Sequence, residues 1–290
     1  MSMNANEMLL FSILLVIASG MINAICGFFT KRSGDKNVFL GSMIAIASIP
    51  LTPHLLMELS AKRLPAAAYL LFALSMLIEG INGLLLARAY KFGDLSQVYP
   101  IMRGTGVTFT PIVGVLFLGE SLTVWGWLGI AGIVAGIFLL SGWKPRSKAE
   151  PLSLKPVLFA FLVGLCITGY TIVDKMALKY ISPLSLLQIG NFGFVLVFLP
   201  TLFRWKLVRA EFAVNWKFIA LAALFAPSSY LLFLFAMDMA PVSHLAPIRE
   251  IGTVFAALLG VWLLKERQGW KRIASAAMIV GGICLIGIVG

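Results

Sequence analysis

Two arginines, Arg103 and Arg249, lie inside long apolar stretches of the chain. An ionised side chain at the centre of a bilayer costs at least about 2.5–3.5 kcal/mol. Arginine keeps its proton in proteins, so each guanidinium needs an anionic partner or a water-filled cavity. Their chemistry therefore favours a binding site for a negatively charged group, with buried ion pairs as the structural alternative.

Other polar side chains in these apolar stretches share helical faces with one another. Glu79 and Asn82 are three residues apart, and Tyr99 and Arg103 are four apart, so each pair occupies one face. Such polar stripes either line a shared cavity or join helices by hydrogen bonds. The residues that we expect to bind substrate or to couple transport are Glu79, Asn82, Tyr99, Arg103, Asn191, Tyr230, Arg249 and Glu250.

Carboxylates near these arginines have two alternative roles. Glu79, near the middle of its helix, either pairs with an arginine or exchanges a proton during transport. Glu250 follows Arg249 directly, so on a regular helix it points about 100° away and the two side chains face different places. Asp174 and Lys175 are expected nearer the outer end of their helix, where Lys175 extends to the interface.

Enzyme chemistry has no support in the sequence. The chain has only two histidines and three dispersed cysteines, which is too few for a convincing zinc site. It lacks a Walker-type glycine–lysine loop, and no serine has a matched base. We therefore predict that the protein is not an enzyme and uses no metal or other cofactor.

The composition predicts an all-α integral membrane protein. Hydrophobic residues make up 60% of the chain and charged residues only 12%, whereas soluble domains carry about 25% charge. A span needs about 20 apolar residues, and the runs are continuous rather than alternating, which excludes a barrel. Ten helices are predicted, over residues 8–30, 37–57, 65–90, 95–118, 122–142, 154–178, 182–204, 216–239, 243–264 and 269–289.

A sequence repeat divides these helices into two halves. Residues 103–120 and 249–266 are identical at seven of eighteen positions, including Arg103/Arg249 and Glu120/Glu266. We predict a first five-helix repeat over residues 1–142, a connecting loop over 143–155 and a second repeat over 156–290. Because five is odd, the repeats must be inverted in the membrane. The two glutamates stand at helix ends, where we expect them to cap or pair with a neighbouring helix.

Basic residues are distributed unequally between the two membrane faces. Sixteen lysines and arginines fall in the loops on one face and three on the other. The positive-inside rule then places the charged loops in the cytoplasm and both termini outside the cell (inner or plasma) membrane. The net charge of +11 is a topology signal rather than a nucleic-acid site, because it is spread over short loops.

The chain resembles the drug/metabolite transporter superfamily, in particular its ten-helix EamA-type members. The resemblance rests on Leu118-Gly119-Glu120-Ser121 and Leu264-Lys265-Glu266, on the glycine-rich helices that follow each of them, and on Ile181-Ser182-Pro183. It covers essentially the whole chain. Members of this superfamily carry small metabolites, amino acids, nucleobases or lipid-linked groups, so the resemblance implies a transporter without naming its substrate.

Together these features predict a secondary transporter that moves a small anionic or zwitterionic metabolite by alternating access. Protons are the candidate coupling ion, and the lipid bilayer is the only other partner expected apart from a second copy of the chain. The helices over 122–142 and 269–289 are candidate surfaces for a homodimer. Two alternatives remain open, a flippase for a lipid-linked or amphiphilic head group and a membrane scaffold that transports nothing.

Overall fold

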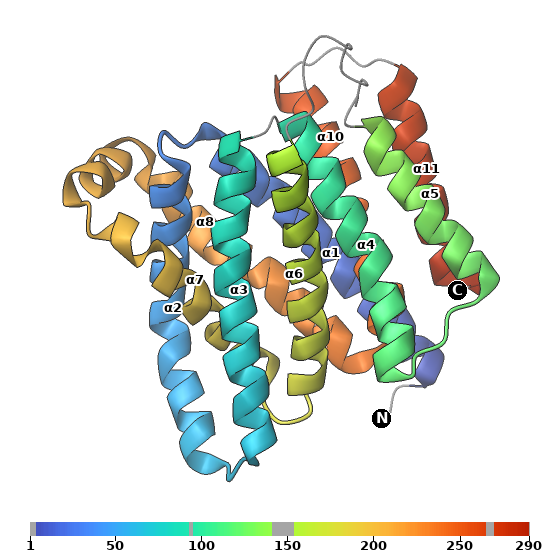
Figure 1. Cartoon of the computed structure of the whole chain (residues 1–290), viewed down its shortest axis with the longest axis horizontal. Coiled ribbons are helices and arrows are strands. Elements are labelled where there is room, and N and C mark those ends of the chain that lie inside the picture. The colour runs from blue at the N-terminus through green and yellow to red at the C-terminus, as the bar shows by residue number, and fades with distance from the viewer. Residues whose placement is uncertain (1–3, 93–94, 141–153, 265–269, 290) are drawn as a thin grey trace.

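The structure is a computed structural model that describes residues 4–92, 95–140, 154–264 and 270–289. Every element in these ranges is a helix (Figure 1). The helices are α1 (Ala5–Arg32), α2 (Lys36–Ala61), α3 (Ala66–Phe92), α4 (Leu95–Leu118), α5 (Val124–Leu140), α6 (Leu154–Ala177), α7 (Pro183–Leu202), α8 (Trp205–Met239), α9 (Val242–Ile248), α10 (Ile251–Leu264) and α11 (Trp270–Val289).

These helices make a multi-pass membrane protein. Seven of the described helices are long and apolar enough to cross a bilayer, and two shorter apolar helices cover Val124–Leu140 and Ile273–Val289. The short helices α9 and α10 follow one another almost without a gap and together occupy the ninth predicted span. A helix satisfies its own backbone hydrogen bonds, which lipid cannot do. The expected all-α fold of ten spans in two five-helix repeats is therefore confirmed.

Helices from the two halves of the chain pack side by side. In the middle of the bundle, α3 lies between α6 and α7, while α1 packs on α8 and α10 and α4 packs on α6 and α9 (Figure 1). At one edge, α5 packs mainly against α11. A homodimer through α5 and α11 would have to use their remaining faces, and it stays a prediction.

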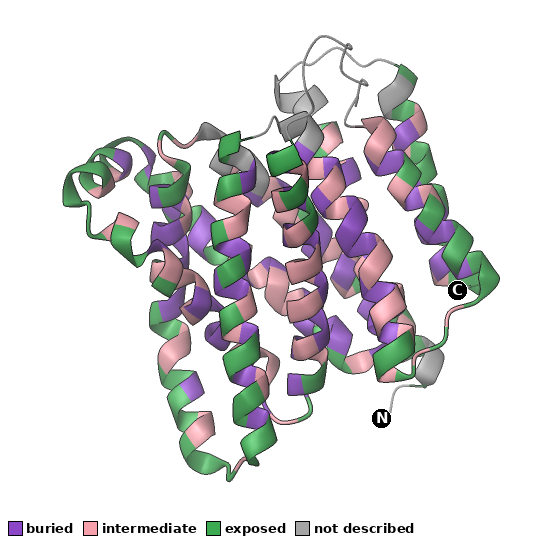
Figure 2. Ribbon diagram, viewed as in Figure 1, coloured by how far each residue is buried: buried purple, intermediate pink, exposed green. Residues whose placement is uncertain are grey.

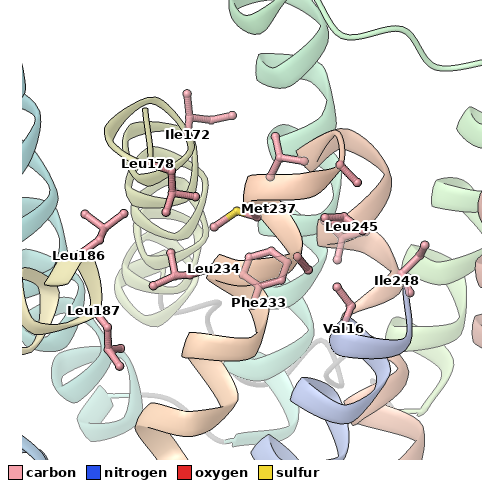
Figure 3. Packing of buried hydrophobic residues seen from close by; sticks show 14 of the residues in the cluster. Val16, Ile172, Leu178, Leu186, Leu187, Phe233, Leu234, Met237, Leu245 and Ile248 are labelled. Atoms are coloured by element: carbon pink, nitrogen blue, oxygen red, sulfur yellow. The ribbon is translucent and has the colours of Figure 1, made fainter. Parts of the chain in front are cut away.

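Buried side chains concentrate where these helices meet, and exposed ones cover the outer faces (Figure 2). The main apolar cluster includes Phe233, Leu234 and Met237 on α8. Phe233 points toward Leu245 and Ile248 of α9, whereas Leu234 points to the opposite side of α8, toward Leu186 (Figure 3). Many large apolar side chains remain exposed on the outside of the bundle. In a membrane protein this exposed apolar surface contacts lipid. Polar side chains inside the bundle are therefore the exception to the general apolar character of the helices.

Helix ends are fixed by side chains that satisfy free backbone N–H groups. The Asp35 carboxylate accepts hydrogen bonds from the amides of Asn37 and Val38 at the start of α2. Ser182 caps α7, and the Glu58 carboxylate from α2 accepts from the Ser182 amide at 3.0 Å. These contacts also join α2 to α7, two helices that are far apart in the sequence.

The loop after α4 reaches across to the second half of the chain. Gly119 has φ +68°, a left-handed conformation that suits glycine and that ends α4. The turn directs Glu120 to α9, where its carboxylate accepts from the amides of Val242 and Ser243, both at 2.8 Å. The expected cap at this glutamate is thus present, whereas its repeat partner Glu266 lies outside the described residues.

Three details differ from the pattern expected of the sequence. Helix α8 begins at Trp205 rather than at 216. Its first turns contain polar residues and form a helical extension that projects beyond α2 (Figure 1). Helices α4 and α8 continue through their internal prolines, Pro100, Pro111 and Pro227, without a break. The ninth span, in contrast, is interrupted at Arg249 and Glu250.

Candidate functional site

A small cavity lies between helices of both repeats and brings the two arginines together. Its volume is about 40 Å³, which accommodates little more than a few water molecules. Arg103 comes from α4 in the first repeat, and Arg249 and Glu250 come from the interruption between α9 and α10 in the second. The remaining lining residues are Gly106, Val107, Thr110, Ile167, Tyr170, Thr171, Phe233 and Ala246.

Arg103 is held by a polar group on the opposite repeat. Its Nη1 donates to Glu250 Oε1 at 3.1 Å, and the second carboxylate oxygen, Oε2, accepts from Thr253 Oγ1 at 2.9 Å. The Tyr99 hydroxyl lies 3.1 Å from Thr253 Oγ1, and the Tyr99 ring lies beside the guanidinium, 5.6 Å from Cζ. Tyr99, Arg103, Glu250 and Thr253 form what we call the cross-repeat clasp.

Arg249 has a different environment. Its Cζ lies 4.5 Å from the centre of the Phe233 ring and 5.2 Å from that of Tyr230, so two aromatic rings of α8 support the guanidinium. Its Nε is buried and has no hydrogen-bond partner among the residues that the structure describes. Within the described part of the chain, no carboxylate forms an ion pair with Arg249, although Glu250 adjoins it in sequence.

The interruption of the ninth span explains how Arg249 and Glu250 reach the same cavity. We expected them to face different places, and this was wrong because the backbone is not a regular helix there. The amides of Glu250 and Gly252 bond to carbonyls three residues back, at Pro247 and Arg249. Helix α1 presses on this turn, since a Cβ on Gly252 would lie 2.7 Å from the Gly20 carbonyl oxygen.

A second polar network lies beside the cavity and includes a buried carboxylate of α6. Asp174 is only 2% exposed and accepts from Ser75 Oγ at 2.6 Å and from the Tyr230 hydroxyl at 2.5 Å. It lies in the last turn of α6, near a helix end as expected, but it is buried among α3, α6 and α8. Because Tyr230 also supports Arg249, this network connects the buried carboxylate to the arginine.

Lys175, the neighbour of Asp174, makes no contact with this network among the described residues. The Lys175 ammonium turns away and donates to the carbonyls of Met237 and Ala240. These carbonyls end α8, where a cation is favourable. Ser75 could have been recognised, because it is four residues before Glu79 and shares its helical face.

Glu79 lies near this network but outside the cavity lining. Its side chain is 7% exposed and faces Gly190 of α7. It forms no ion pair with the described residues, but it is close enough to Asp174 and Arg249 to interact with both electrostatically. The Tyr170 ring, which contacts the Tyr230 ring at 5.9 Å, belongs to the same group of side chains.

Of the eight predicted residues, Arg103, Arg249 and Glu250 line the cavity, and Glu79, Asn82, Tyr99, Asn191 and Tyr230 do not. Asn191 on α7 is buried and donates to Gln188 Oε1 at 3.4 Å, and Gln188 in turn donates to Thr52 of α2. Asn82 is also buried, and its Oδ1 has no hydrogen-bond partner in the described part of the chain. Among the residues that the structure describes, no group of three His, Cys, Asp or Glu side chains could hold a metal ion.

Comparisons with known proteins agree with the repeat. An uncharacterized transporter encoded in the cobO 3′ region of Sinorhizobium sp. is 42% identical over 78 residues, which are 27% of this chain and 55% of that protein. The multidrug resistance protein EbrB of Bacillus atrophaeus is 35% identical over 65 residues, 22% of this chain and 56% of its own. The chain thus spans about half the length of the curated relatives it matches.

The fold also matches a solved structure along its whole length. A protein crystal structure aligns with a TM-score of 0.76 over 98% of this chain and 99% of that chain, at 13% sequence identity, which is evidence for the fold alone. The EamA-like transporter family matches residues 10–142 and, a second time, residues 154–288. Two matches that cover both five-helix halves show that this chain belongs to the EamA-like transporter family.

Proposed function

We propose that the protein is a secondary transporter that moves a small anionic or zwitterionic metabolite across the cell membrane by alternating access. The observation that carries this proposal is the cavity in which Arg103, Arg249 and Glu250 converge from the two repeats. Binding sites of transporters with inverted repeats lie at the repeat interface and often use interrupted helices. The interruption at Arg249 and Glu250 has this character.

The size of the cavity supports a mechanism that requires movement of the helices. Sites for small molecules usually enclose about 300–1,000 Å³, whereas this cavity has about 40 Å³. A metabolite could therefore enter only if the helices of the two repeats separate on one side. The cross-repeat clasp joins α4 to the α9–α10 region, so it must loosen or shift in that movement.

The chemistry of the cavity favours a negatively charged substrate group. Two arginines face the cavity against one lining carboxylate, Glu250. The relatives named EbrB are described as multidrug resistance proteins. A purely cationic drug fits this site less well, because the guanidinium groups would repel it.

Glu79 is the residue that we propose for coupling to protons. It is buried beside Asp174 and the arginine of the second repeat, and alternating access could expose it to each side in turn. A proton taken up on one side would then be released on the other. Asp174 provides a neighbouring carboxylate whose interaction with Glu79 depends on how many protons the two groups hold.

For the orientation, we propose that both termini lie outside the cytoplasm. The sixteen basic residues on one face support this topology. Ser147, which lies outside the described residues, belongs to the loop between the repeats. A cysteine at this position should resist an impermeant thiol reagent in intact cells, and labelling from outside would reverse the assignment.

The test of the function is transport by the purified full-length protein in liposomes. Uptake of radiolabelled anionic and zwitterionic metabolites should depend on the protein and should disappear in both Arg103→Ala and Arg249→Ala. Partial activity in the lysine variants would indicate that bidentate contact matters. Scrambling of a labelled lipid without metabolite uptake would favour a flippase, and neither activity would favour a scaffold.

A further inference from the structure

The two arginines occupy matching positions in the repeat, but within the described ranges Arg103 receives a carboxylate from the other half and Arg249 does not. In the alignment of residues 103–120 with 249–266, Glu250 corresponds to Gly104. Glu250 of the second repeat pairs with Arg103 of the first at 3.1 Å. The reciprocal contact cannot form, because Gly104 has no side chain to offer to Arg249.

The surroundings of Arg249 orient its donors without using them. Stacking on Phe233 and Tyr230, at 4.5 and 5.2 Å, fixes the plane of the guanidinium. The N–H donors of a guanidinium lie in that plane, along its edge, in a fork that matches the two oxygens of a carboxylate. Nε is buried without an acceptor from the described chain, so the fork is suited to an acceptor supplied by a ligand.

The cavity beside Arg249 has the polarity of a site for an organic acid. Val107, Ile167 and Phe233 contribute apolar surface, and Thr110 and Thr171 contribute hydroxyl groups. A ligand with a small apolar body would contact the first group while its charged end meets Arg249. A doubly charged phosphate is less favourable, because Glu250 lines the same cavity and Asp174 lies behind Tyr230.

We propose that Arg249 binds the carboxylate of a small organic monocarboxylate, and that Arg103 does not contact this ligand but holds the repeats together through Glu250. The inference rests on the proposed function, since it names the charged group of the transported metabolite. One carboxylate is expected because, among the described residues, Arg103 has a carboxylate partner and Arg249 has none. Phe233 and Tyr230 act as positioning residues that orient the guanidinium.

The first test measures ligand-dependent thermal unfolding of the full-length protein in detergent. Benzoate and acetate serve as carboxylate probes, and benzamide and benzylamine serve as the matched neutral and cationic controls. Benzoate should raise the unfolding temperature with increasing concentration, while benzamide and benzylamine should not. Equal responses to benzoate and benzamide, or no response to either carboxylate, would overturn the assignment.

Variants then locate the probe. Arg249→Gln should abolish the response to benzoate. Arg249→Lys should weaken the affinity for benzoate at least about tenfold, because lysine keeps the charge but loses the forked pair of N–H donors. Phe233→Leu should weaken the affinity for benzoate less than Arg249→Gln does. Arg88→Gln, which removes an exposed arginine of α3, is the control and should leave the affinity unchanged. If Arg249→Gln does not fold, Arg249→Lys decides, and unchanged affinity in it would contradict the proposal.

The two proposals fail in distinguishable ways. Liposome uptake that is confined to metabolites without a carboxylate would refute the carboxylate site and leave the transporter function standing. Benzoate binding that depends on Arg249, in a protein that transports no metabolite, would refute the proposed function and support the site.

Discussion

Arg103 and Arg249 stand at the same position of two repeats, but their backbones and their neighbours differ. Arg103 is part of the continuous helix α4 and pairs with Glu250, whereas Arg249 stands at the interruption between α9 and α10 and stacks on two aromatic rings. The difference traces to one repeat position that is Gly104 in the first copy and Glu250 in the second. Duplication thus supplies two arginines, and the residue that follows each of them determines whether the other arginine receives a carboxylate.

Removal of Glu250 should have the largest effect on stability. Glu250→Ala leaves the Arg103 guanidinium, which is only 23% exposed, without the carboxylate that pairs with it. Loss of one partner of a buried pair costs about 3–5 kcal/mol, so we expect about 3 kcal/mol less free energy of unfolding at this partly buried site. Arg249→Met, which breaks no ion pair within the described chain, should cost far less. Chemical denaturation in detergent would compare the two, and similar losses would remove the distinction between the arginines.

Tyr230 tests whether Arg249 depends on the network behind it. Tyr230→Phe keeps the ring beside Arg249 but removes the hydroxyl that donates to Asp174 at 2.5 Å. A hydrogen bond to a charged group contributes about 1.5–3 kcal/mol, so we expect a loss of about 2 kcal/mol in the free energy of unfolding. Tyr170→Phe is the matched control, because the structure shows a ring contact for Tyr170 and no hydrogen bond of its hydroxyl with the described residues. An equal loss in both variants would argue against the Asp174 contact.

Glu120 tests the contribution of the α9 cap. In Glu120→Gln the side chain keeps one acceptor oxygen but loses its charge at the amides of Val242 and Ser243. We expect about 1 kcal/mol less stability, as for other helix caps. We also expect loss of this cap to displace α9 and with it Arg249, which should weaken benzoate binding a few-fold. The Arg103–Glu250 pair should stay in place. Unchanged benzoate affinity at reduced stability would show that the cap does not position Arg249.

Glu79 should have the smallest effect on stability, because it forms no ion pair with the described residues. Glu79→Gln should preserve substrate binding and exchange but abolish accumulation driven by a pH gradient. Liposomes with an imposed gradient would measure accumulation, and equal internal and external pH would measure exchange. Unchanged proton-driven accumulation would exclude Glu79 from coupling and leave Asp174 as the carboxylate to examine.

The fold could be predicted from the sequence, because hydropathy and the repeat both reflect the membrane environment. Long apolar runs predict helices because in lipid the backbone must form its own hydrogen bonds. The match between residues 103–120 and 249–266 divides the chain into halves. The capping role of Glu120 was also predictable from its place at a helix end. These features depend on local composition and need no knowledge of which helices are neighbours.

The contacts within the site were not accessible in the same way. The interruption at Arg249 and Glu250 lies against α1, whose Gly20 approaches Gly252 from more than two hundred residues away in the sequence. For the ninth span we expected a regular helix, which would direct Arg249 and Glu250 to different places. In the structure both side chains line the same cavity. The contacts of Asp174 were not predictable for a similar reason, since its partners Ser75 and Tyr230 belong to other helices.

Equilibrium binding of radiolabelled benzoate tests most directly whether the two arginines differ in role. The comparison is between Arg249→Met and the double variant Arg103→Met/Glu250→Met, which removes the whole ion pair and leaves no unpaired charge. We predict that the double variant keeps its affinity for benzoate within about threefold, whereas Arg249→Met shows no saturable binding. Loss of binding in the double variant with retention in Arg249→Met, or equal loss in both, would contradict the account.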